Sequence, residues 1–127
     1  MTQIRKKQHY VVIHKSSIGA EHAAKSVYSL QSPIVPLYIL QDFKELFEYL
    51  PYYVGNQKIE FLIKPMYRNF KFPLLIHIKE VPREEELERM IVLLEEAEQP
   101  IYIATQPSIF DQFECLALTS RMTILKP

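Results

Sequence analysis

The sequence has little cysteine and little glycine, and each shortage excludes a class of site. The single cysteine, Cys115, excludes an intramolecular disulfide and a zinc site made of cysteines alone, which favours a reducing compartment. The two glycines, Gly19 and Gly55, are too few for the G-x-G-x-x-G motif by which many α/β domains bind a dinucleotide. We therefore expect no cofactor.

Long hydrophobic runs and an excess of one charge are also missing. No apolar run approaches the roughly 18 residues of a membrane span, and the first residues, with Arg5, Lys6 and Lys7, lack the apolar core of a signal peptide. Fifteen basic residues balance fifteen acidic ones, so no overall field attracts a nucleic acid or an anionic membrane. We expect a cytoplasmic protein with no membrane partner, and a nucleic acid only through a local contact.

What is present is an apolar fraction of 48% in 127 residues, enough for the core of a single domain spanning residues 1–127. Apolar patterns predict strands at 10–14, 34–40, 58–64, 74–78, 100–104 and 122–125. Helical spacing and capping residues predict helices at 20–30, from Asp42 to Leu50, at 83–98 and after Ser108. The predicted order is β-α-β-α-β, twice.

The two halves, residues 11–65 and 74–127, resemble each other in sequence. Matched positions include Ile13 and His14 with Ile76 and His77, Tyr38 and Ile39 with Tyr102 and Ile103, and Lys64 and Pro65 with Lys126 and Pro127. A duplicated unit of this kind predicts a three-layer α/β domain with a mostly parallel, Rossmann-like sheet of six strands in the order 3-2-1-4-5-6 and helices on both faces. Residues 66–73 form a basic and aromatic connector between the halves.

In such a sheet, ligands bind where the strand order reverses, which is here between the first strands of the two halves. Hydroxyls, amides and cations in the two loops at this point suit an anion. The candidate residues are Lys15, Ser16, Ser17, Gly19, His22, Lys79 and Arg83. The alternative is that a serine caps the helix and that the cations are simply solvated.

Catalytic and metal sites have weaker support. His14, His22 and His77, with Glu80 or Glu84, would offer zinc ligands, but their spacing matches no established motif. His14 and His77 end predicted strands, where a backbone partner is the simpler expectation. Because Cys115 has no evident base beside it in sequence, we expect a small core residue. We predict no metal and no catalytic set.

The connector interleaves cations with aromatic residues, a pattern typical of surfaces that bind single-stranded nucleic acid or another partner. Its candidate binding residues are Tyr67, Arg68, Phe70 and Lys71. The alternative is a crossover whose aromatic rings pack on the sheet while its cations reach into solvent.

These observations favour a non-catalytic protein-interaction or assembly module, bound to a protein partner or to itself. This hypothesis depends on the absence of a catalytic set and on the number of aromatic residues in predicted loops, which is larger than a solitary domain needs. These residues are Tyr52, Tyr53, Tyr67 and Phe70. The alternative is a small-ligand or nucleotide-binding domain, which includes the case of a degenerate enzyme, with its site where the strand order reverses.

Overall fold

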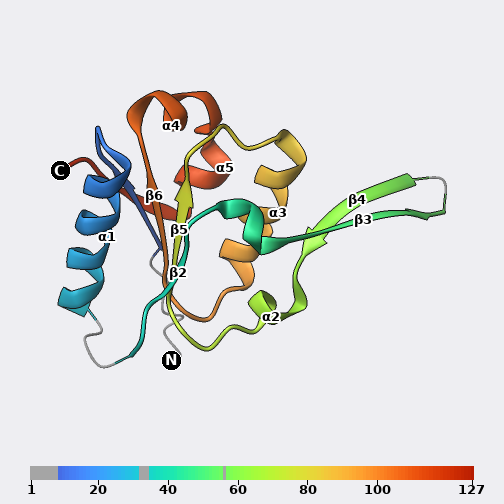
Figure 1. The fold of residues 1–127 in the computed structure, drawn as a ribbon, viewed down its shortest axis with the longest axis horizontal. Coiled ribbons are helices and arrows are strands. Elements are labelled where there is room, and N and C mark those ends of the chain that lie inside the picture. The colour runs from blue at the N-terminus through green and yellow to red at the C-terminus, as the bar shows by residue number, and fades with distance from the viewer. Residues whose placement is uncertain (1–8, 32–34, 56) are drawn as a thin grey trace, which may run out of the picture.

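A computed structural model describes residues 9–31, 35–55 and 57–127, and its centre is a five-stranded sheet (Figure 1). The strand order is β2-β5-β6-β1-β7, and all four pairings are parallel. The strands are β1 (His9–Ile13), β2 (Tyr38–Leu40), β5 (Leu74–Ile78), β6 (Ile101–Thr105) and β7 (Met122–Leu125).

Helices cover both faces of this sheet, as predicted. They are α1 (Ser17–Gln31), the short α2 (Pro65–Arg68), α3 (Glu84–Glu96), α4 (Pro107–Phe113), α5 (Leu116–Thr119) and a 3-10 turn, η1 (Phe43–Leu46). In β1, Val11 and Ile13 pack in the core under η1, α3, α4 and α5, whereas Tyr10 and Val12 pack under α1. The three-layer arrangement follows from this alternation, because successive strand residues point to opposite faces.

The α1 side depends on small residues and on a pair of tyrosines. Ala20 and Ala24, one helical turn apart, are fully buried against the sheet and let α1 approach it closely. The rings of Tyr10 and Tyr102 stack with centroids 5.4 Å apart, and both hydroxyls hydrogen-bond to Gln31 at the end of α1. Burial raises the pKa of Tyr102 to about 12, so this hydroxyl stays protonated as a donor.

Residues 47–63, between β2 and β5, form a hairpin outside the sheet. The helix predicted from Asp42 to Leu50 was therefore wrong over its second half. Asp42 does cap a helical turn, since its Oδ1 accepts from the Lys44 amide at 3.0 Å, but the predicted helix from Asp42 to Leu50 ends after η1. The chain continues as β3 (Phe47–Val54), which pairs antiparallel with β4 (Gln57–Ile63). Aromatic residues and Pro51 disfavour a helix over this segment and favour an extended chain.

The predicted six-stranded sheet and its order 3-2-1-4-5-6 are therefore not found. The segment predicted as an edge strand at 58–64 is β4 of the hairpin, and β1 lies beside β6 and β7 rather than beside β5. The structure does not confirm the duplication: residues 11–65 supply two strands to the sheet, and residues 74–127 supply three. A buried apolar strand does not specify which strand lies next to it, which is why the order was not predictable from the apolar patterns.

Among the described residues, no helix has both the length and the apolar character needed to span a membrane.

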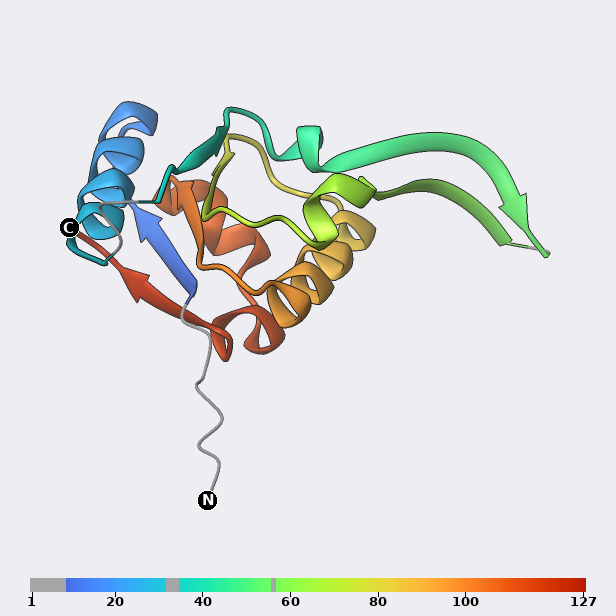
Figure 2. The same cartoon turned by 90° about the horizontal axis from the view of Figure 1, so that it is seen from below.

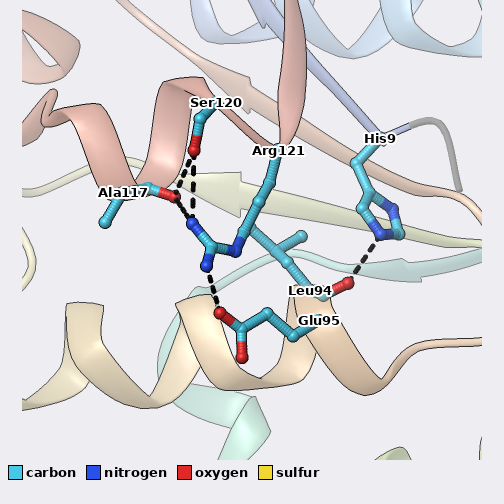
Figure 3. Close-up of polar contacts among 6 residues, drawn as sticks. All are labelled: His9, Leu94, Glu95, Ala117, Ser120 and Arg121. Carbon is cyan, nitrogen blue, oxygen red and sulfur yellow. Dashed lines mark hydrogen bonds and ion pairs between the residues drawn. The ribbon is translucent and has the colours of Figure 1, made fainter. Parts of the chain in front are cut away.

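His9, at the start of β1, joins three elements through a buried imidazole (Figure 3). The residue is only 2% exposed. Its Nδ1 accepts from the Ile101 amide at 3.0 Å, so Nε2 carries the proton and donates to the Leu94 carbonyl at 2.8 Å. This ring therefore links β1 to the start of β6 and to α3. Figure 3 also shows the surface pair of Arg121 and Glu95 beside it.

Replacing this imidazole should destabilise the fold strongly. In His9→Phe, the Ile101 amide and the Leu94 carbonyl lose their partner in a buried place, so we expect the free energy of unfolding to fall by about 2 to 5 kcal/mol. Arg121→Gln is the control, because it breaks an exposed ion pair and should cost less than about 1 kcal/mol. Urea unfolding measures both, and equal losses would contradict a structural role for the His9 ring.

Candidate functional site

The reversal point of this sheet lies between β1 and β6. The chain leaves β1 for α1 on one face, whereas it leaves β6 for α4 on the opposite face (Figures 1 and 2). A ligand crevice is expected between two such strands. Here the two loops are bonded to each other: the Gln106 side chain donates to the Lys15 carbonyl at 2.7 Å, and the His14 amide donates to the Thr105 carbonyl at 3.1 Å.

The residues of the first predicted loop mainly build the start of α1. The Ser16 hydroxyl accepts from the Gly19 amide at 2.9 Å, which is the geometry of an N-cap. A Cβ added at Gly19 would lie 2.2 Å from Nδ1 of His14, so the glycine makes room for this imidazole. Lys15 and His22 are exposed and Ser17 is partly exposed.

The structure does not place the second predicted loop beside the first. Lys79 and Arg83 follow β5 and lead into α3, on the face opposite α1, and β6 lies between β5 and β1. Lys79 is exposed, and Nε of Arg83 lies 3.9 Å from a carboxylate oxygen of Glu85. The predicted strand order required Lys79, Arg83 and Lys15 to line one crevice together. The observed order does not bring them together in this way.

A polar cluster that the sequence analysis missed lies between α1, β5 and the end of β2. The Glu21 carboxylate accepts from Nε2 of His77 at 2.7 Å and from the Gln41 amide at 3.1 Å, and pairs with Lys25 at 2.9 Å. Lys25, then His77 and Gln41, hold the pKa of Glu21 at about 2, below its ordinary 4.5. His77 thus has a carboxylate partner instead of the expected backbone partner. The i, i+4 spacing of Glu21 and Lys25 was the one signal in the sequence.

The imidazole of this cluster is buried, since His77 is only 2% exposed. Within the described ranges, no group of three or more His, Cys, Asp and Glu residues is placed to hold a metal ion. Cys115 is partly buried against the main core.

A groove of about 510 Å³ lies between α1 and the end of β7. Its lining residues are Val12, Ala23, Ser26, Val27, Leu125, Lys126 and Pro127. Because this lining is mostly apolar, the groove suits an apolar group better than a phosphate.

The aromatic connector packs mainly against the core. Tyr67 is 5% exposed, and its ring lies near those of Tyr38 and Phe70, with centroids 6.4 and 5.7 Å away. Phe70 is partly buried, while Arg68 and Lys71 are exposed. Burial raises the pKa of Tyr67 to about 12. The Tyr67 ring is therefore not available to a partner, whereas the two cations are.

The β3–β4 hairpin lies outside the five-stranded sheet; we call it the arm, residues 47–63. It extends away from the sheet in both views (Figures 1 and 2). Its register shifts between Tyr49 and Tyr52, so two residues of β3, including Pro51, lie opposite one residue of β4. Gly55, with φ of +63°, provides the turn. Among the described residues, no third strand pairs with this hairpin.

A buried carboxylate anchors the base of the arm to α3. Glu86, 2% exposed, accepts from the Tyr49 hydroxyl at 3.1 Å and from the Arg83 amide at 2.8 Å. Burial, and then Glu86, raise the pKa of Tyr49 to about 12, so the phenol donates at any ordinary pH. The Lys64 amide also donates to the Leu46 carbonyl at 2.7 Å, which closes the base of the hairpin.

The Glu21 cluster should make the fold sensitive to acid. The pKa of Glu21 is lowered in the folded chain, so its contribution to stability is complete above pH 4.5 and is lost as the pH falls towards 2. Glu21→Gln should therefore flatten the dependence of the unfolding free energy on pH between these values. Glu88→Gln, at an exposed position of α3, is the matched control. The same slope in Glu21→Gln and in the wild type would show that the cluster contributes nothing.

Removing the Tyr49 hydroxyl should loosen the arm. Tyr49→Phe leaves one oxygen of the buried Glu86 without this donor, and we expect a loss of about 1 to 2 kcal/mol in unfolding free energy. Amide exchange near Phe47 and Ile63 should become faster. Tyr28→Phe is the control, since the Tyr28 ring packs edge-on against Tyr102, and we expect a change within about 0.5 kcal/mol. Unchanged exchange at the base of the arm in Tyr49→Phe would contradict the anchor.

The described residues thus contain two hydrogen-bonded loops at the carboxyl end of the sheet, an apolar groove beside α1, and the arm. Comparison of the chain with protein-family models, with curated proteins and with solved structures finds no match.

Proposed function

We propose that this chain is a cytosolic, non-catalytic interaction module that binds a protein through its arm. The observation that carries the proposal is the projecting hairpin, to which no further strand pairs in the described part of the chain. Two strands alone are marginally stable in water, and an added strand would complete their backbone hydrogen bonds. Strand addition of this kind is a common way to recognise a protein segment.

The two edges of the arm differ in how well they are protected. β3 contains a register shift and Pro51, both of which discourage the pairing of a further strand. The extra residue at this shift belongs to β3, whereas β4 supplies the single residue opposite and contains no proline. We therefore assign the binding edge to β4.

The composition of the arm also supports an interface. Tyr49 is 47% exposed, and the strands contain Tyr52, Tyr53, Ile59 and Phe61 as well. Tyrosine and other aromatic residues are enriched at protein interfaces. The two tyrosines that the sequence analysis singled out in a predicted loop belong to β3 of the arm.

The alternative, binding of a nucleotide or another small anion at the reversal point, has less support. The Gln106 bond to Lys15 spans that point, and the cations Lys15 and Arg83 precede helices on opposite faces. The Ser16 hydroxyl is already committed to the cap of α1.

An arm-less variant tests the proposal. Residues 48–62 are replaced by a short Gly-Ser linker, which keeps Phe47 and Ile63 and therefore the core contacts. The wild-type chain, tagged and cross-linked through its lysines in cells, should give intermolecular cross-links from Lys58. The arm-less variant should remain folded by circular dichroism and lose its bound protein.

The double variant Lys15→Ala/Lys79→Ala is the matched control, because it alters the predicted anion site at two exposed residues outside the arm. It should bind as the wild type does. Loss of binding in this control but not in the arm-less variant would overturn the proposal and favour the carboxyl end of the sheet.

A further inference from the structure

We propose that the protein bound by the arm is a second copy of this chain, with the β4 strands of the two copies paired antiparallel about a twofold axis at Ile59. The inference rests on the proposed function and adds the identity and register of the partner. It joins two hairpins into one four-stranded antiparallel sheet, which supplies the further strands that a lone hairpin lacks.

Strand geometry limits the possible registers. In an antiparallel pair, directly opposite residues must belong to the same hydrogen-bonding class, and the class alternates along a strand. When a strand pairs with its own copy about a twofold axis, one residue must therefore lie directly opposite its own copy. We name the axis by the number of that residue. A slip of one position would also exchange the two faces of the strand.

The charges of β4 then select one register. Lys58 and Glu60 flank Ile59, so an axis at position 59 sets Lys58 of each copy opposite Glu60 of the other. An axis at 58 or 60 would instead set two lysines or two glutamates opposite each other, and an axis at 61 would set Lys58 opposite Lys64. Opposite charges across a strand pair stabilise it and like charges destabilise it. An axis at 62 would set Glu60 opposite Lys64, but Lys64 lies beyond the end of β4. Position 59 is therefore the axis that brings opposite charges of the strand itself together.

The shape of the molecule is compatible with this pairing. The arm extends beyond the main sheet in both views, and antiparallel pairing sets the tip of each arm beside the base of the other (Figure 2). The two sheet domains then lie at opposite ends of the joined arms. Pairing of the arms therefore requires no rearrangement of the five-stranded sheet.

Charge reversal tests the register. Sedimentation velocity should show a concentration-dependent dimer for the wild type. Lys58→Glu and Glu60→Lys should each raise the dimer dissociation constant by about tenfold or more, because each makes both charge pairs repulsive. The double variant Lys58→Glu/Glu60→Lys should restore dimerisation, and an equimolar mixture of the two single variants should form a heterodimer.

Lys71→Glu and Glu114→Lys are the controls, since they make the same charge changes at exposed positions outside the arm. They should dimerise as the wild type does. An equal loss in the controls, or a folded double variant that stays monomeric, would overturn the register.

A disulfide test locates the axis independently. In a Cys115→Ala background, Ile59→Cys places the new thiol opposite its own copy, within the separation that a disulfide spans. Gln57→Cys lies opposite Phe61 of the other copy and out of reach of itself, so it should cross-link far less. Equal cross-linking at both positions would place the axis elsewhere.

The outcomes separate this inference from the proposed function. A wild-type chain that stays monomeric at all concentrations, but gives arm-dependent cross-links to a different protein, would overturn self-pairing and leave the proposed function standing. Self-association that persists in the arm-less variant would overturn both.

Discussion

The structure depends on the position of β1 between β6 and β7, because this pairing joins the beginning of the described chain to its end. Tyr10 lies opposite Tyr102 on one side and Thr123 on the other. Closing so long a loop costs entropy before any contact is made, and parallel pairing of distant strands is slow for the same reason. The bonds made by His9 at one end of β1 and by Lys15 beyond the other end stabilise this pairing.

The arm follows from the same constraint. With β6 and β7 on either side of β1, and β5 between β2 and β6, the segment after β2 has no place inside the sheet. It folds back on itself as β3 and β4, packs its base against η1 and α3 through Phe47 and Glu86, and leaves the rest of the hairpin outside. The three inner strands of the sheet pair on both sides, whereas the arm keeps edges that another strand can pair with.

Much of the local structure was predictable, and the arrangement of the elements was not. The apolar runs at β1, β5 and β6 are buried strands, and helical spacing located α1 and α3, because burial and periodicity are encoded within each segment. The helix predicted after Asp42 failed because Phe43, Leu46 and Phe47 fit helical spacing only as far as the end of η1, where the chain becomes extended. Strand order depends on contacts between distant segments, and the spacing of apolar residues within one segment carries no information about those contacts.

The candidate site shows the same division. The bond from the Gly19 amide to the Ser16 hydroxyl agrees with the alternative that a serine caps this helix, which the sequence could offer because capping depends on neighbours in sequence. The partner of His77 was missed, because Glu21 reaches it only when α1 covers β5. The same applies to the arm: its second strand was predicted at 58–64, but the isolation of the arm from the sheet appeared only with the strand order.

The two ends of the molecule differ in how their polar groups are paired. The polar groups around α1 bond to one another: Glu21 to His77, Gln41 and Lys25, and Gln106 to Lys15. The arm has the opposite property. Among the described residues, no further strand pairs with the outer side of β4. Such an edge recognises another strand through the backbone, while Lys58 and Glu60 add the charge pattern that decides which strand and which register fit.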